Sequence, residues 1–85
     1  MNEAIEVAMY SYSVVLTYDA AERCWYASVP AFDGATTDGD TPEEALAHAR
    51  ELIEGQIAVI LDHGWDIPVE DEPARIERIA LARPA

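Results

Sequence analysis

The stretch that decides the fold is Gly39-Asp40-Thr41-Pro42-Glu43-Glu44-Ala45-Leu46, which carries the signals of a helix N-terminus. The Thr41 hydroxyl can cap the first turn, and Glu44, three residues later, can reach back to the Thr41 amide. Pro42 suits the first helical position, where an amide hydrogen is not needed. Glu43 and Glu44 place negative charge near the positive end of the helix dipole. The sequence therefore predicts a helix that begins directly after Thr41.

The residues that follow keep helical spacing as far as Gly64. Apolar residues recur on one face, which comprises Leu46, Ala49, Ile53, Ile57 and Ile60. Gly64 offers the left-handed conformation with which helices commonly end. A helix of about 22 residues spans roughly 33 Å, enough to cross a small sheet. Because one amphipathic helix cannot bury its apolar face alone, the rest of the chain must supply the surface on which it packs.

The chain before this helix alternates between apolar and polar residues with the period of a β-strand. We expect a first strand from Tyr10 to Tyr18, a second from Cys24 to Val29 and a short third from Ala35 to Asp38. Polar residues 19–23 form the hairpin loop between the first two strands. Pro30 ends the second strand because proline has no amide hydrogen to donate to a neighbouring strand.

The chain after Gly64 is irregular and acidic up to Pro73. The apolar residues from Ile76 to Ala82 predict a final strand, with a short helix after Pro73 as the alternative. We interpret residues 1–9 as an N-terminal arm and residues 10–85 as a single domain. The predicted fold class is α+β, with the order β-β-β-α-β and one long helix on one face of an antiparallel sheet.

One helix covers only one face of such a sheet. The opposite face is expected to present Val15, Thr17, Cys24 and Tyr26, a partly apolar set. A chain of 85 residues lies near the lower limit for a self-sufficient core. Both observations favour a homo-oligomer, a dimer or a tetramer.

The charge balance is strongly acidic, with 17 Asp and Glu residues, five arginines, no lysine and a net charge of −12. Direct binding to nucleic acid needs cationic groups that displace counterions from phosphates, and anionic membranes select for the same groups. We therefore expect neither nucleic acid nor a membrane as a direct partner. A basic protein would be attracted. Alternatively, the acidic surface serves solubility alone.

Nothing in the sequence indicates export or a disulfide framework. Cys24 is the single cysteine, which excludes an internal disulfide and a cysteine-based zinc cluster. The first residues are acidic where a signal peptide is basic, and no apolar run reaches membrane-spanning length. We expect a cytoplasmic protein.

No set of residues predicts catalysis. His48 and His63 are the only imidazoles and lie in no metal-binding motif, with His48 expected on the solvent side of the helix. Asp33, Asp38 and Asp40 surround the third strand and could in principle hold a divalent cation. Their spacing is not that of an EF-hand loop, and turn chemistry explains them. We expect no enzyme activity, no cofactor and no metal.

Three segments together resemble the HicB-like antitoxin family. They are Tyr12–Leu16, Trp25–Pro30 and Phe32–Ala45, and within the last the run Gly39–Ala45 is the specific part. The resemblance covers roughly residues 12–68, and residues 76–82 stand in the place of the family's last strand. The turn differs, since Ala31–Ala35 stands where the family often has Asp-Leu-Pro-Gly-Cys.

The resemblance implies a partial RNase H-like fold without a competent RNase H active site. It also implies neutralisation of a small basic HicA toxin, a protein that cleaves mRNA. Family members commonly form dimers or larger oligomers. Longer members carry a DNA-binding domain after the last strand. We expect this chain to be the short form without that domain, so the resemblance implies no repression by direct DNA contact.

The leading hypothesis is therefore an antitoxin that acts by binding. The alternatives are a solitary oligomeric acidic module without a toxin, and a degraded nuclease that keeps metal-dependent activity. The predicted partner-binding or oligomer interface combines the open sheet face with nearby acids, and it comprises Val15, Thr17, Tyr26, Asp33, Asp38, Asp40, Glu43 and Glu44.

Overall fold

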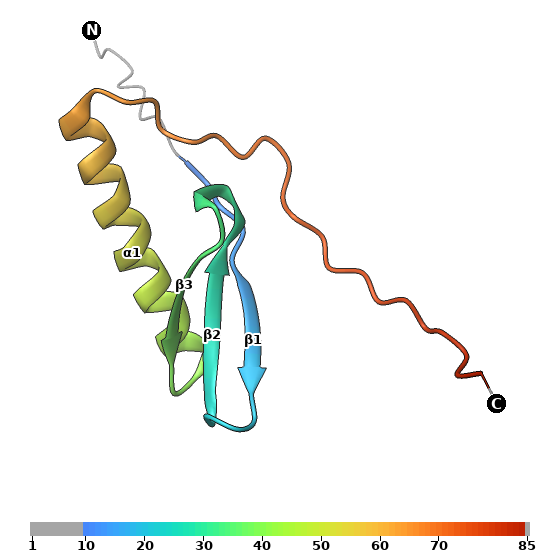
Figure 1. Cartoon of the computed structure of the whole chain (residues 1–85). Coiled ribbons are helices and arrows are strands. Elements are labelled where there is room, and N and C mark those ends of the chain that lie inside the picture. The colour runs from blue at the N-terminus through green and yellow to red at the C-terminus, as the bar shows by residue number, and fades with distance from the viewer. Residues whose placement is uncertain (1–9, 85) are drawn as a thin grey trace, which may run out of the picture.

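The computed structural model describes residues 10–84 and contains three strands followed by one long helix (Figure 1). The elements are β1 (Val15–Asp19), β2 (Cys24–Val29), the short 3-10 helix η1 (Pro30–Phe32), β3 (Ala35–Gly39) and α1 (Pro42–His63). The predicted α+β class and the order of these elements are confirmed. The arm predicted for residues 1–9 lies outside the described residues.

The three strands form an antiparallel sheet in the order β1-β2-β3. β1 begins at Val15, five residues later than predicted, because its partner strand ends: Val15 lies opposite Ser28, and Pro30 turns the chain into η1 two residues further on. The antiparallel order places the β1–β2 turn and the β3–α1 connection at the same end of the sheet (Figure 1). The opposite end of the sheet carries η1.

The predicted helix signals operate as expected at both ends of α1. The Glu44 amide donates to the Thr41 hydroxyl at 3.1 Å, and Gly64 ends the helix with φ of 71°. One detail differs, because the Glu44 carboxylate accepts from the amide of Asp40 at 3.4 Å rather than from that of Thr41. The helix has the expected length of 22 residues.

The hydrophobic core between the sheet and α1 is small. Its buried residues among those described are Ala27, Val29, Phe32, Ala45 and Ala49. The prediction that Leu46 lies in the core is wrong, since its side chain is 44% exposed. A Cβ atom added to Gly39 would lie 2.4 Å from the Ala45 amide nitrogen, so the first turns of α1 approach β3 closely. Only small side chains fit there, and larger ones (Ile53, Ile57 and Ile60) pack against the core farther along the helix.

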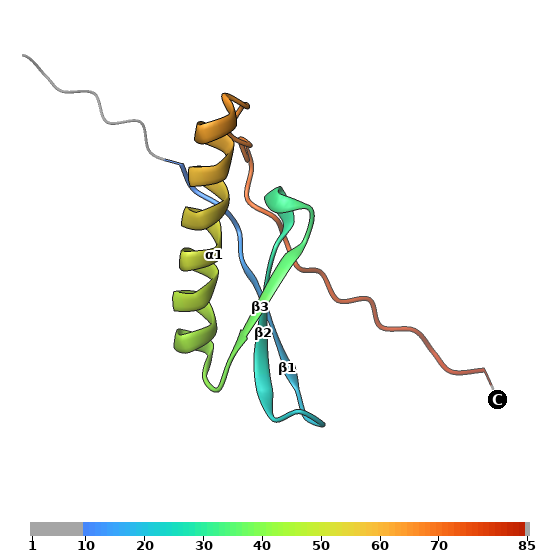
Figure 2. The same cartoon turned by 60° about the vertical axis from the view of Figure 1, so that its left-hand side comes forward.

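Residues 65–84, the C-terminal segment, form neither a helix nor a strand. The predicted final strand at residues 76–82 is therefore wrong for the single chain, and so is the alternative short helix. The physical reason is that the segment has no neighbour within the part of the chain that the structure describes. Ile76, Ile79 and Leu81 are 73%, 83% and 86% exposed, and a strand needs a hydrogen-bonding partner along its length. Figures 1 and 2 show the segment leaving the body on the β1 side.

Candidate functional site

The sheet has one face packed against α1 and an opposite face that we call the open face (Figure 2). Because successive side chains of a strand alternate between faces, the residues between those that pack on the core point away from α1. The open face comprises Val15, Thr17, Asp19, Cys24, Tyr26, Ser28, Thr36 and Asp38. It mixes hydroxyl, carboxyl and apolar groups on a rigid sheet, as protein-binding surfaces commonly do.

Three of the predicted interface residues form one row across the centre of the open face. Thr17 lies opposite Tyr26, and Tyr26 lies opposite Asp38. Directly opposite residues in a sheet have their Cβ atoms about 5 Å apart. The structure thus brings together residues that are up to 21 positions apart in the sequence. Their role in binding stays a prediction.

Tyr26 is the half-buried aromatic residue at the middle of this row. Hydrogen bonding with the Cys24 side chain raises the pKa of the Tyr26 phenol, and electrostatic interaction with Cys24, burial and the carboxylates of Asp19 and Glu22 act in the same direction. The phenol is therefore neutral at physiological pH. It offers an aromatic surface together with a hydroxyl that can donate a hydrogen bond to a partner.

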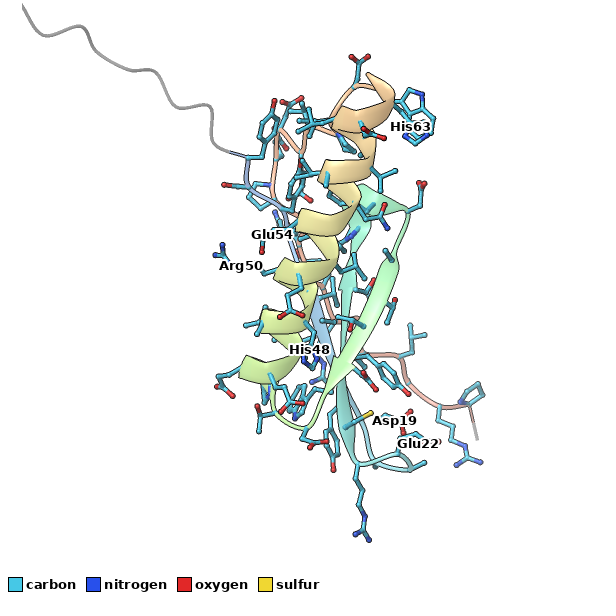
Figure 3. All side chains as sticks on the ribbon, turned by 90° about the vertical axis from the view of Figure 1, so that its left-hand side faces the viewer. Asp19, Glu22, His48, Arg50, Glu54 and His63 are labelled. Carbon is cyan, nitrogen blue, oxygen red and sulfur yellow. The ribbon has the colours of Figure 1, made fainter. Side chains whose placement is uncertain are left out.

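The lower end of the sheet in Figure 1 gathers acidic residues from three parts of the chain. We call this group the acidic end, and it comprises Asp19, Glu22, Asp38, Asp40, Glu43 and Glu44. Figure 3 shows Asp19 and Glu22 at the same end as the first turn of α1. These two residues were missed by sequence reasoning, because only the antiparallel pairing of β1 with β2 carries them there. Arg23, in the same turn, is the nearby basic residue.

Asp33 does not belong to the acidic end. It follows η1 in the left-handed conformation, with φ of 57°, at the opposite end of β3. Gly34 and the five residues of β3 separate it from Asp40, and the five strand residues alone span roughly 16 Å. Asp33, Asp38 and Asp40 therefore cannot share one cation. Within residues 10–84 no three His, Cys, Asp or Glu side chains lie close enough to hold a metal ion.

His48 connects α1 to the edge strand β3. Its Nδ1 lies 2.6 Å from the carbonyl oxygen of Asp38, and its side chain is half-buried rather than solvent-facing as expected. The hydrogen bond to this carbonyl raises the pKa of His48. Burial opposes the rise, and the carboxylates of Glu44, Glu51 and Asp38 support it. His48 thus stabilises the helix on the strand that carries Asp38.

The start of the C-terminal segment is held against residues 12 and 13. The Tyr12 hydroxyl donates to the carbonyl of Pro68 at 2.7 Å, and the amide and hydroxyl of Ser13 both contact the Glu70 carboxylate, at 2.9 and 2.7 Å. The Ser13 hydroxyl also accepts from the Ala74 amide at 2.9 Å. No local signal in the sequence predicts contacts across more than 50 residues.

A groove of about 620 Å³ runs between residues 10–14 and α1. Its floor is largely apolar, formed by residues such as Tyr12, Val14 and Ile53. Arg50 and Glu54 stand at its border on α1 (Figure 3). The groove is partly enclosed, and its lining among residues 10–84 contains no catalytic grouping. No helix in the described part of the chain is long and apolar enough to cross a membrane.

Comparison with known protein families identifies a match over most of the chain. The family model described as the HicB-like antitoxin of bacterial toxin–antitoxin systems matches residues 11–82, which is most of the chain. No curated protein and no solved structure matches. The matched range includes the three strands, α1, the open face, the acidic end and residues 76–82 of the C-terminal segment.

Proposed function

Because the chain belongs to the HicB-like antitoxin family, we propose that it binds and neutralises a small basic HicA-type toxin, an enzyme that cleaves mRNA. In this proposal the chain acts by protein–protein contact in the cytoplasm and catalyses no reaction. The observation that carries the proposal is the continuity of the open face with the acidic end. The row of Thr17, Tyr26 and Asp38 leads from an aromatic centre directly into a group of carboxylates.

The two parts of this surface have different tasks in the proposal. Val15, Thr17 and Tyr26 supply the packed centre of the interface, where an aromatic anchor contributes most to affinity. Asp38, Asp40, Glu43 and Glu44 pair with the arginines and lysines with which a toxin would hold RNA phosphates. An acidic surface in that position excludes RNA from the toxin. Asp33, at the opposite end of β3, lies outside this surface.

We also propose that the antitoxin is a homo-oligomer. Val29 is the largest side chain that is fully buried among the described residues. Several large apolar side chains on and after α1 are at least half exposed, namely Val59, Leu61, Trp65, Val69, Ile76, Ile79 and Leu81. A second copy that covers part of this surface would compensate for the small core.

The proposal is tested by co-purification with the product of the neighbouring gene and by rescue of growth when that product is expressed. The double variant Asp38→Asn/Asp40→Asn should bind the toxin about tenfold more weakly, since two charge-assisted contacts are lost. Asp33→Asn is the matched control, because asparagine also tolerates the left-handed conformation of residue 33. Equal affinity for all three proteins, or an affinity independent of salt, would contradict the electrostatic part of the proposal.

A second variant tests the centre of the open face. Tyr26→Arg places a long cation where we expect an aromatic contact with a basic partner, and it should abolish growth rescue. Should the variant keep both its oligomeric state and its affinity for the toxin, the open face has no part in binding.

The exposed apolar residues also suit a second candidate function, a solitary oligomeric acidic module without a toxin. The two candidates differ in the neighbouring reading frame. If the adjacent gene encodes no small basic protein and no such protein co-purifies, the solitary module is the better account.

A further inference from the structure

We propose that residues 75–83 of one chain add as a fourth strand to the outer edge of β1 in a second copy. The second copy in turn adds its own residues 75–83 to β1 of the first, so the two chains form a reciprocal dimer. We call residues 75–83 the exchanged segment. The inference rests on the homo-oligomer of the proposed function and is independent of the toxin. The inference gives a role to residues 75–83, which pair with no strand among residues 10–84.

The outer edge of β1 is open to strand addition. Within the described residues β1 pairs with β2 alone, so alternate residues of β1 direct their amide and carbonyl groups outward. Edge strands are often protected by proline, lysine or a bulge, and Val15–Asp19 contains neither of these residues and pairs with β2 without interruption. This edge therefore accepts another strand.

The exchanged segment has the composition of a strand. Pro73 and Pro84 bound a run without proline or glycine, in which Ile79 and Leu81 share one side. Ile76, Arg78, Ala80 and Ala82 share the other side, and Glu77 falls on the side of Ile79 and Leu81, near the start of the segment. With Ile79 and Leu81 on the helix-covered face, beside the row that contains Leu16, Arg78 lies on the open face. There it is on the same side of the sheet as Asp19.

The distribution of charge selects a copy of this chain as the partner. Three of the five arginines lie in the exchanged segment, as Arg75, Arg78 and Arg83, whereas all but one of the 17 acidic residues precede residue 75. Glu77, the exception, pairs with Arg75. A basic segment fits the acidic body of a second chain, and Asp19 and Glu22 stand at the end of the β1 edge itself. A basic toxin would instead repel the segment.

The path of the chain favours exchange over pairing with its own β1. The contacts of Ser13 with Glu70 and with the Ala74 amide hold the segment beside the entry to β1. Figure 1 shows the chain diverging from β1 beyond Ala74. The side chains of this part of the chain are exposed. Pro68 and Pro73 stiffen this connection, because a residue before proline favours an extended backbone. A stiff connection that projects an unpaired strand is a simple route to a reciprocal dimer.

The test compares the oligomeric state of the full chain with that of two leucine variants. Light scattering after size exclusion, from about 1 to about 100 µM, should find a dimer for the unmodified chain. Leu81→Glu should weaken the dimer by at least about tenfold, because each dimer loses two buried leucines. Leu61→Glu is the control: Leu61 belongs to the same set of exposed apolar residues, but it lies on α1, and strand exchange at the β1 edge covers Leu81 and leaves Leu61 uncovered. A monomeric unmodified chain, or equal dimer affinities of the two variants, would overturn the proposal.

A mixture of isotope-labelled and unlabelled chains decides between exchange and other dimers. Exchange predicts intermolecular NOEs between amide protons of residues 76–82 and those of residues 15–19. If these NOEs arise within one chain, or if intermolecular NOEs appear only elsewhere, the exchange is refuted. Growth rescue separates the outcomes: a monomer that still rescues growth refutes the exchange and leaves the antitoxin proposal intact.

Discussion

The body of the molecule, residues 12–64, and the C-terminal segment, residues 65–84, relate differently to their own sequence. In α1 the local signals and the tertiary contacts agree: Thr41 caps the start of the helix, Gly64 caps its end, and the apolar side chains between them pack against the sheet. In the C-terminal segment the local pattern is that of a strand, but residues 75–84 have no neighbour among residues 10–84 with which to form one. The comparison separates two kinds of information in a sequence.

A helix forms its backbone hydrogen bonds within itself, so its first and last residues can be predicted from the local sequence. A strand forms its backbone hydrogen bonds with another strand, so its alternating pattern predicts that it needs a partner strand but does not identify that partner. The difference explains why Pro42–His63 forms in the single chain whereas Ile76–Ala82 does not. It also makes the C-terminal segment the part whose structure depends on what the chain binds.

The largest effect is expected in the body, where α1 approaches β3. Gly39→Ala should destabilise the fold by about 3 kcal/mol, because the new Cβ meets backbone atoms of Glu44 and Ala45 that cannot rotate away. Urea unfolding followed by circular dichroism at one fixed chain concentration measures the change. At a chain concentration low enough to keep the chain monomeric, the variant should leave hydrogen exchange in residues 75–84 as it is, since these residues form no helix or strand in the single chain.

Gly55→Ala is the matched control for this substitution. Gly55 lies inside α1, and an added Cβ there meets no atom within 4 Å. The variant should be more stable by about 1 kcal/mol, as expected for alanine in place of glycine in an exposed helix. A similar loss of stability in both variants would show that the close approach at Gly39 does not limit the packing of α1.

The next largest effect is expected at the junction between the two regions. Glu70→Ala removes the acceptor of two hydrogen bonds from Ser13 and should cost about 1–2 kcal/mol of local stability around residues 68–74. Hydrogen exchange of the Ser13 and Ala74 amides should accelerate about tenfold or more. Glu72→Ala, an exposed neighbour in the same connection, is the control. Equal exchange rates in the two variants would mean that Glu70 does not fasten the segment.

The body also shows which parts of the site follow from sequence. The limits of β2 were predicted correctly because Pro30 ends the strand wherever its partners lie. Leu46 was assigned to the core wrongly, because helical spacing does not report how closely α1 approaches Gly39. The acidic end could be predicted only with the strand pairing known. That pairing brings Asp19 and Glu22 to the end of the sheet where α1 begins, and Asp33 lies at the opposite end. The contact of Ser13 with Glu70 has no local signal at all.

A smaller effect is expected at the start of α1. Thr41→Ala removes the acceptor for the Glu44 amide and should cost about 1 kcal/mol. Thr41→Ser keeps the hydroxyl and should restore most of the stability. Because this cap is local to the helix, the loss should appear in urea unfolding of the body while the Ser13–Glu70 contacts persist. Coupled loss of protection at Ala74 would show that body and segment unfold as one unit, contrary to the comparison.

The smallest effect is expected at His48 and depends on pH. The pKa of His48 is raised in the folded state, chiefly by the hydrogen bond to the Asp38 carbonyl. Its contribution to stability is therefore fully present below the unfolded pKa of about 6.5 and is lost as pH rises through the higher folded value. His48→Gln keeps an N–H donor that does not titrate. The stability of the unmodified chain relative to this variant should fall between about pH 6 and pH 8.

Urea unfolding of both proteins at a series of pH values measures this difference, and His63, present in both, cancels from it. An NMR titration of the His48 ring gives the same information directly, since its midpoint should lie above about 6.5. A flat difference, or a midpoint below that value, would show that the ring does not hold its proton against the β3 backbone. His48 would then pack on Asp38 without securing it, and the acidic end would keep its geometry through the Thr41 cap and the close approach at Gly39 alone.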